Sequence, residues 1–142
     1  MVFFDAAVEI TMSAGVRAGE QTMIRYVINA SVSNAALNAL FASAWPEHVS
    51  CDFSSVFAGG LGHICAFDGD DLIGFVNVAW DGAKHAFLLD PTVRGDLQRK
   101  GVGSELVRLA AGLAKARGVE WLHVDYEPRL ADFYCKCGFR HT

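Results

Sequence analysis

The segment with the clearest chemical potential is Gln98–Ser104 (QRKGVGS), which lies between an apolar run and a helical pattern. Residues 85–89 before it predict a buried strand, and apolar residues recur at helical spacing over 102–113 after it. A glycine turn that opens a helix presents unpaired backbone N–H groups and the positive end of the helix dipole. Arg99 and Lys100 add full positive charge. The segment therefore predicts capture of an anion, namely the phosphate or pyrophosphate of a nucleotide-like cofactor.

The glycine spacing argues against two common phosphate-binding loops. Leu106 occupies the third glycine position of a G-x-G-x-x-G fingerprint, and the Lys-Ser/Thr pair of a Walker loop is missing. The segment instead resembles the Q/R-x-x-G-x-G/A signature of the GNAT superfamily of N-acetyltransferases, which cradles the pyrophosphate of acetyl-CoA. Residues 133–139 (FYCKCGF) are similar to the family's F-Y-x-x-x-G-F segment.

Apolar and turn patterns predict the elements that position these motifs. Strand patterns lie at 23–28, 64–67, 72–80, 85–93 and 121–126, helical patterns at 33–45 and 101–118, and a short helix and loop at 47–60. This order indicates an α+β protein with mixed strand directions. The resemblance, which covers the chain from Met23 onward, implies a GNAT-like fold with a mixed, mostly antiparallel sheet flanked by helices.

The resemblance to the GNAT family also implies a division of the chain into an extension and a domain. We expect the acetyltransferase domain at 23–142 and an N-terminal extension at 1–22. Within the extension, Val8, Ile10 and Met12 alternate with polar residues, which predicts one added strand.

The resemblance also implies which residues act. Tyr134 matches the tyrosine that protonates the departing thiolate, a task for which an ordinary phenol keeps its proton at neutral pH. Pro91 lacks a backbone N–H and is consistent with a strand end that splays from its neighbour and contacts the cofactor. The residues expected to bind acetyl-CoA are Thr92, Val93, Gln98, Arg99, Lys100, Gly101, Val102, Gly103 and Ser104.

The base that accepts the proton of the attacking amine is less clearly marked. Asp90 shares the strand alternation of Leu88, which would bury its carboxyl on an apolar face and favour proton uptake. We therefore expect Asp90 to be catalytic, while a solvated turn aspartate would show the same pattern. Asp125, Glu127 and His85 also lie near predicted strand ends or turns and are alternatives.

The acceptor is expected to be a cationic amine on a small molecule or peptide. Aromatic faces and carboxylates together suit an ammonium group. The residues expected to surround it are Trp45, Trp80, Tyr126, Asp81, Asp90 and Glu127.

Composition narrows the remaining classes of partner. The net charge of −4, with no basic cluster beyond Arg99-Lys100, argues against nucleic acid. No apolar run reaches the roughly 20 residues of a membrane span, and the N-terminus lacks the pattern of a signal peptide. The four cysteines show no metal-ligand spacing, so we expect no metal, reduced thiols and a cytoplasmic location.

The chain departs from the resembled family at its end. Thr142 follows soon after Gly138-Phe139, where the family continues into a last strand, so we expect that strand to be missing. The edge left open would be covered by Val8–Met12 or by a second protomer in a homodimer.

These observations predict transfer of acetyl from acetyl-CoA to a primary amine by direct attack on the thioester. Two alternatives stay open. One is an acyl-CoA-binding or sensor module without catalysis. The other is a small interaction domain whose glycine turn binds a different phosphate ligand.

Overall fold

The computed structural model describes residues 9–17 and 20–141 and folds them around one six-stranded sheet. The elements in chain order are β1 (Glu9–Arg17), β2 (Glu20–Ile28), α1 (Asn34–Ala44), α2 (Ser54–Gly59), β3 (Gly60–Asp68), β4 (Asp71–Trp80), β5 (His85–Val93), a 3-10 turn (Gly95–Leu97), α3 (Val102–Ala116), β6 (Trp121–Val124), a second 3-10 turn (Pro128–Leu130) and α4 (Ala131–Lys136). Among these helices, none is both long and apolar enough to cross a membrane.

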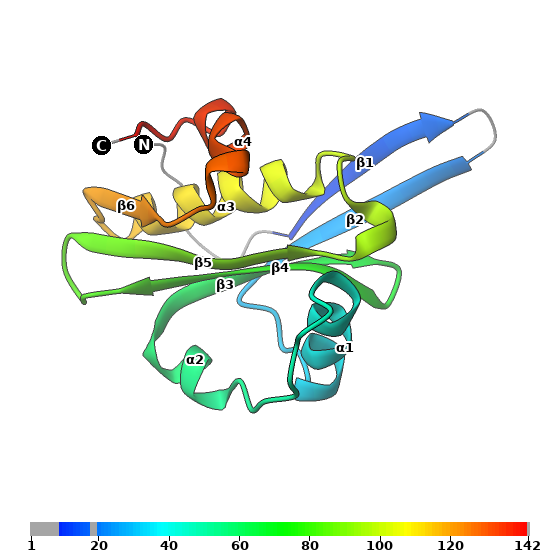
Figure 1. Ribbon diagram of the computed structural model, residues 1–142, viewed down its shortest axis with the longest axis horizontal. Coiled ribbons are helices and arrows are strands. Elements are labelled where there is room, and N and C mark those ends of the chain that lie inside the picture. The colour runs from blue at the N-terminus through cyan, green and yellow to red at the C-terminus, as the bar shows by residue number, and fades with distance from the viewer. Residues whose placement is uncertain (1–8, 18–19, 142) are drawn as a thin grey trace.

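The strands lie side by side in the order of the sequence. Neighbours from β1 to β5 are antiparallel, and β6 alone runs parallel to its neighbour β5. Helices α1 and α2 cover one face of the sheet, and α3 and α4 cover the other (Figure 1). This arrangement confirms the predicted α+β class with a mixed, mostly antiparallel sheet flanked by helices.

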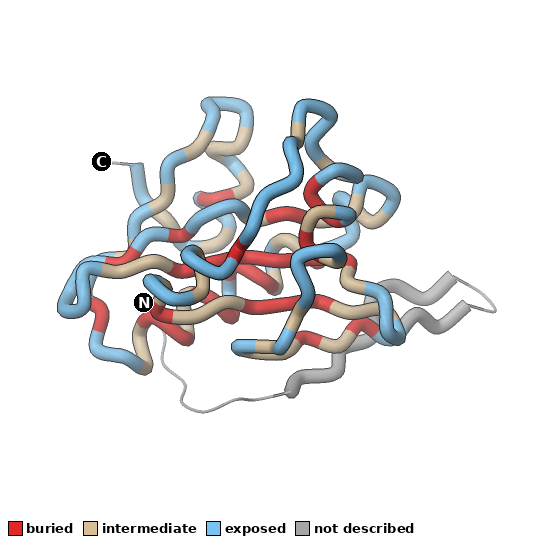
Figure 2. Tube along the Cα trace, turned by 90° about the horizontal axis from the view of Figure 1, so that it is seen from below, coloured by how far each residue is buried: buried red, intermediate tan, exposed pale blue. Residues whose placement is uncertain are grey.

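Each face of the sheet has its own apolar core. Side chains of β3 and β4 alternate between them: Ile64, Val76 and Val78 pack toward α3, while Cys65 and Phe75 pack toward α1. The buried residues run through the middle of the molecule, and the connecting turns are exposed (Figure 2). The two cores hold the two helical layers at fixed positions on either side of β4 and β5.

Local sequence features set the position of α1. The Ser33 hydroxyl accepts a hydrogen bond from the Ala36 amide (3.1 Å) and caps the start of the helix. Leu37, Leu40 and Phe41 form its buried stripe. The helix ends at Ala44, with Trp45 as its C-cap, as the following proline predicts.

Helix α3 packs closely against the sheet at Gly74 of β4. A methyl group at Gly74 would lie 3.0 Å from Leu106 Cδ1 and 3.3 Å from Val102 Cγ1. Only glycine leaves room for that approach, so the first turns of α3 are pressed onto β4. The glycine turn that precedes α3 is thereby held beside the end of β5.

The sheet edges differ from one sequence-based expectation. Val8 lies outside the described residues, and Glu9–Met12 pair with β2 at the edge opposite β6. The prediction that this segment covers the open edge at β6 is therefore wrong, because β1 forms a hairpin with the next strand along the chain. Strand β2 begins at Glu20, so Met23 lies inside a strand.

Candidate functional site

Strand β5 parts from β6 halfway along its length. The two strands pair only from His85↔Trp121 to Leu88↔Val124, whereas β5 continues to Val93 along β4. The side of β5 that faces away from β4 therefore has no strand partner after Leu88 among the described residues. Its backbone groups are available to an extended ligand, as the predicted splay requires.

A bulge in β5 marks the point where the strands part. Asn77 pairs with Leu89 and Phe75 pairs with Thr92, so Asp90 and Pro91 together face the single residue between Phe75 and Asn77. Asp90 has a φ of +52°, a conformation that aspartate tolerates better than most residues. The bulge changes which residues of β5 point to each face.

The glycine turn follows directly after β5. The Gln98 side chain donates a hydrogen bond from Nε2 to the Val93 carbonyl oxygen (3.1 Å), which closes the intervening loop. Arg99 has a φ of +62°, and Gly101, the N-cap of α3, has a φ of +88°. At Gly101 an L side chain would be strained, so this position favours glycine for conformational reasons.

The first turn of α3 has the features of an anion site. No side chain caps the helix, and its backbone hydrogen bonding begins with the Glu105 amide, which donates to the Gly101 carbonyl. Arg99 and Lys100 are exposed beside the amides of the first turn. The helix dipole, the uncapped amides and the two cations all favour a phosphate or pyrophosphate here.

The predicted cofactor residues differ in what they can offer. Gln98, Arg99, Lys100, Gly101 and Ser104 are exposed. Val102 and Thr92 are only 1% and 2% exposed, so these two can contribute little beyond their backbone groups. Val93 and Gly103 are half-buried between these extremes.

Helix α4 packs over the start of α3. A methyl group at Gly103 would lie 3.6 Å from the ring of Phe133, and the Ser104 side chain is hydrogen-bonded to the Cys137 thiol. Burial raises the pKa of Cys137, and the Ser104 hydrogen bond partly offsets this. These contacts bring the F-Y-x-x-x-G-F segment next to the glycine turn.

Tyr134 lies in this contact region and is 3% exposed. Its ring packs against Phe133, Phe139 and Tyr126, with centroid distances of 5.0, 5.7 and 5.2 Å. Since Tyr126 follows the end of β6, Tyr134 lies near the point where β5 and β6 part. Burial raises the pKa of Tyr134, so its hydroxyl keeps its proton at neutral pH.

Asp90 is exposed, so the expectation that its carboxyl is buried is wrong. The reason is the bulge, because the extra residue breaks the alternation that places Leu88 in the core. Asp90 instead lines a pocket on the α1 face of the sheet.

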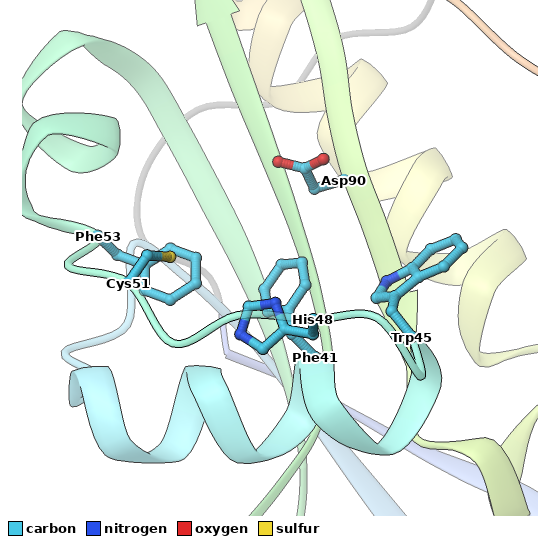
Figure 3. A pocket seen from close by; sticks show the side chains of 6 residues that line it. All are labelled: Phe41, Trp45, His48, Cys51, Phe53 and Asp90. Atoms are coloured by element: carbon cyan, nitrogen blue, oxygen red, sulfur yellow. The ribbon is translucent and has the colours of Figure 1, made fainter.

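That pocket, called the α1 pocket below, has a volume of about 420 Å³. Its lining residues come from α1, from the loop before α2 and from the β5 bulge, and they are Phe41, Trp45, His48, Cys51, Phe53 and Asp90. Figure 3 shows the rings of Phe41, His48 and Phe53 grouped beside α1, with the Asp90 carboxylate extending from β5. Sequence analysis found Trp45 and Asp90 but missed the other four residues.

Two asparagines one helical turn apart hold the loop wall of the pocket to α1. Asn38 donates from Nδ2 to the Cys51 carbonyl (2.8 Å) and accepts from the Cys51 amide at Oδ1 (3.0 Å). Asn34 accepts from the Phe53 amide (3.0 Å). Asn38 Oδ1 also contacts His48 Nε2 (2.8 Å), so Nε2 is the nitrogen that carries a hydrogen.

The remaining residues expected around the acceptor lie elsewhere. Trp80 packs against the core on the α3 side, and Tyr126 lines a separate depression of about 280 Å³ with Asp125 and Glu127. The residues expected around one acceptor pocket are therefore divided between two depressions, apart from Trp80 and Asp81, which line neither. The alternative base His85 starts β5 and contacts His123 (Nδ1···Nε2, 2.8 Å), away from the bulge.

No group of three or more His, Cys, Asp or Glu side chains among the described residues is arranged to hold a metal ion. The four cysteines are free thiols, and burial raises the pKa of Cys65 to about 12.

Solved structures of several other proteins share this fold. A GNAT family acetyltransferase from Streptococcus pneumoniae TIGR4 matches with 24% identity and a TM-score of 0.69, over 83% of this chain and 88% of that one. The aminoglycoside N-acetyltransferase AAC(6')-Iy, in complex with CoA, matches with 17% identity and a TM-score of 0.71, over 89% and 93%. Glucosamine-6-phosphate N-acetyltransferase from Arabidopsis thaliana matches with 14% identity and a TM-score of 0.67, over 82% and 92%.

At these identities the structures establish the fold, and the family rests on sequence. No curated protein sequence matched the chain. The model of the acetyltransferase (GNAT) family matches residues 32–139, which is more than half of the chain and includes the glycine turn, the β5 bulge and Tyr134. The chain therefore belongs to the GNAT family of acetyltransferases.

Proposed function

We propose that this protein is an N-acetyltransferase that moves the acetyl group of acetyl-CoA to a primary amine by direct attack on the thioester. The observation that carries the proposal is the continuity of the unpaired side of β5 with the uncapped start of α3. An extended ligand with a pyrophosphate at one end and a thioester at the other suits such a path. CoA in the similar structure of AAC(6')-Iy supports the choice of ligand.

Two kinds of group would contact the cofactor, namely backbone groups and charged side chains. The first-turn amides of α3, from Val102, Gly103 and Ser104, would hold the pyrophosphate, with Arg99 and Lys100 adding charge. The backbone of Thr92 and Val93 would contact the arm that leads to the thioester. Gln98 supports this arrangement by holding the turn to Val93.

Tyr134 and Asp90 would handle the protons. As the amine nitrogen bonds to the acetyl carbon and the carbon–sulfur bond breaks, the Tyr134 hydroxyl donates its proton to the departing sulfur. Asp90, exposed at the bulge, accepts the proton that the amine loses and passes it to solvent. Tyr134 then regains a proton from solvent and is ready for the next turnover.

Isothermal titration with acetyl-CoA and with CoA tests the first half of this proposal. We expect both to bind, and substitution of Arg99 by alanine to weaken both by a similar factor, since each carries the pyrophosphate. An amine panel then tests the second half. Cofactor binding with no acetylation of any amine would favour a binding or sensor module, and no binding of CoA would favour a different phosphate ligand.

A further inference from the structure

The α1 pocket is lined by stacked rings. Phe41 lies at the centre, with its ring 5.4 Å from that of His48 and 5.3 Å from that of Phe53, and both pairs are close to parallel. Trp45 is 38% exposed and adds a fourth ring. Phe41 and Phe53 are buried, so the ring surface open to a ligand comes from Trp45 and His48. Exposed ring faces contact a flat apolar group and attract a cation placed over them.

The pocket contains one carboxylate. Asp90 is the only acidic residue among its lining residues. Asp52, beside Phe53 in the sequence, already receives hydrogen bonds from Ser54 Oγ (2.7 Å), the Ser54 amide (3.0 Å) and Asn34 Nδ2 (3.0 Å). The pocket therefore offers a counter-charge to one ammonium group.

The walls of the pocket are tied to one another before any ligand binds. Trp45 donates a long hydrogen bond from Nε1 to Thr92 Oγ1 (3.4 Å), and the Thr92 hydroxyl donates to the Asp90 carbonyl (2.9 Å). This chain of bonds links the end of α1 to the β5 bulge. Because Asn38 also holds the opposite loop, a ligand would lose little free energy to ordering the pocket.

We propose that the α1 pocket binds amines with one positive charge and an aromatic body, the arylalkylamines, and selects them over polyamines and aminosugars. The ammonium pairs with Asp90, and the aromatic ring packs on Trp45 and His48. A ligand with several ammonium groups would leave all but one without a counter-charge among these rings. The volume of about 420 Å³ suits a small molecule of this size.

As an acceptor class this inference rests on the proposed acetyl transfer, but as a binding specificity it stands apart from it. Binding of phenethylamine, hexylamine and spermidine is measured by titration, with and without CoA, so that no turnover is required. We expect phenethylamine to bind about fivefold more tightly than hexylamine, which has the same charge but no ring. We expect it to bind about tenfold more tightly than spermidine, which lacks the ring and also carries charges that Asp90 alone cannot match. Equal or tighter binding of spermidine or hexylamine would overturn the inference.

Substitutions in and outside the α1 pocket test whether the preference for phenethylamine arises there. Asp90→Asn should weaken phenethylamine binding about threefold to fivefold, as expected for an exposed ion pair, and leave the binding of its neutral analogue phenylethanol unchanged. Trp45→Leu should reduce the preference for phenethylamine over hexylamine, while Trp121→Leu, at another exposed tryptophan outside the pocket, should not. Equal effects of the two tryptophan substitutions would place the binding elsewhere and overturn the inference.

The two proposals fail in different ways. If phenethylamine binds with these variant effects but is not acetylated, the pocket inference stands and acetyl transfer fails. If spermidine or an aminoglycoside is acetylated more efficiently than phenethylamine, acetyl transfer stands and the inference about acceptor class is overturned.

Discussion

The glycine turn and the α1 pocket both border β5, but the turn presents backbone groups to a ligand and the pocket presents side chains. The turn offers backbone: uncapped amides, positive φ angles at Arg99 and Gly101, and an open strand edge. The pocket offers side chains: stacked rings and the Asp90 carboxylate, fixed by asparagines of α1. The turn consists of 7 consecutive residues beside the end of β5, whereas the pocket combines residues 41–53 with Asp90, far away in the sequence.

This difference suggests a division of tasks. Backbone amides at a helix start recognise phosphate groups regardless of most side chains, so the turn suits a ligand common to a whole family. Ring stacking and a single charge depend on every side chain that supplies them, so the pocket suits a ligand particular to this chain. Substitutions at the turn and at the pocket should therefore affect different measured quantities.

The largest expected effect is on the rate of the chemical step and leaves cofactor binding unchanged. Tyr134→Phe should lower kcat about a hundredfold, within the range for loss of a general acid, with the acetyl-CoA Kd unchanged. Burial raises the pKa of Tyr134, so the wild-type enzyme should not lose this proton donor until the pH exceeds 10. Steady-state kinetics up to pH 10, together with titration of acetyl-CoA, check both statements.

Tyr26→Phe is the matched control for that substitution. Tyr26 is also 3% exposed and belongs to the same apolar core, and burial with the nearby Glu105 raises its pKa to about 12. Loss of the Tyr26 hydroxyl should leave kcat within about twofold of the wild type, since Tyr26 lies in β2, away from the point where β5 and β6 part. Similar kcat values for the two variants would remove Tyr134 from the mechanism.

The next effect concerns the backbone geometry of the turn. Gly101→Ala should weaken acetyl-CoA binding about tenfold, because alanine at a φ of +88° costs about 1–2 kcal/mol and the turn relaxes away from its anion-binding shape. Gly82→Ala, in the β4–β5 turn at a φ of +83°, should lose similar stability and keep the wild-type Kd. Equal Kd values for the two variants would show that the turn does not hold the cofactor.

A smaller effect is expected from loosening the pocket wall. Asn38→Ala removes the bonds that hold His48 and Cys51 to α1, which should raise the KM for the amine about fivefold, the equivalent of about 1 kcal/mol. The Kd of acetyl-CoA should stay the same. Ser43→Ala serves as the control, because the Ser43 hydroxyl donates to the Leu40 carbonyl within α1. A changed cofactor Kd in Asn38→Ala would mean that the two regions are not independent.

The same difference explains how much the sequence could predict. The turn, Tyr134 and the order of strands and helices follow from local spacing and from motifs of consecutive residues. The burial of Asp90 was predicted wrongly because strict alternation along β5 takes no account of the bulge, which is visible only in the pairing with β4. Phe41, His48 and Phe53 come together through tertiary packing, and the asparagines that arrange them resemble ordinary helix-surface residues.

The smallest expected effect lies at the second glycine of the turn. A methyl group at Gly103 would lie 3.6 Å from Phe133 and 3.8 Å from Val93, which is ordinary van der Waals contact. Alanine is also the better helix former, so Gly103→Ala should keep or slightly increase stability and change the acetyl-CoA Kd less than about twofold. A tenfold loss of binding in a variant that melts no lower than the wild type would mean that the cofactor itself occupies the space beside Gly103. Cofactor binding at the turn would then depend on the lack of a side chain at position 103 as well as on exposed amides. The identity of a residue would matter at the turn as it does in the pocket, so the two regions would differ less.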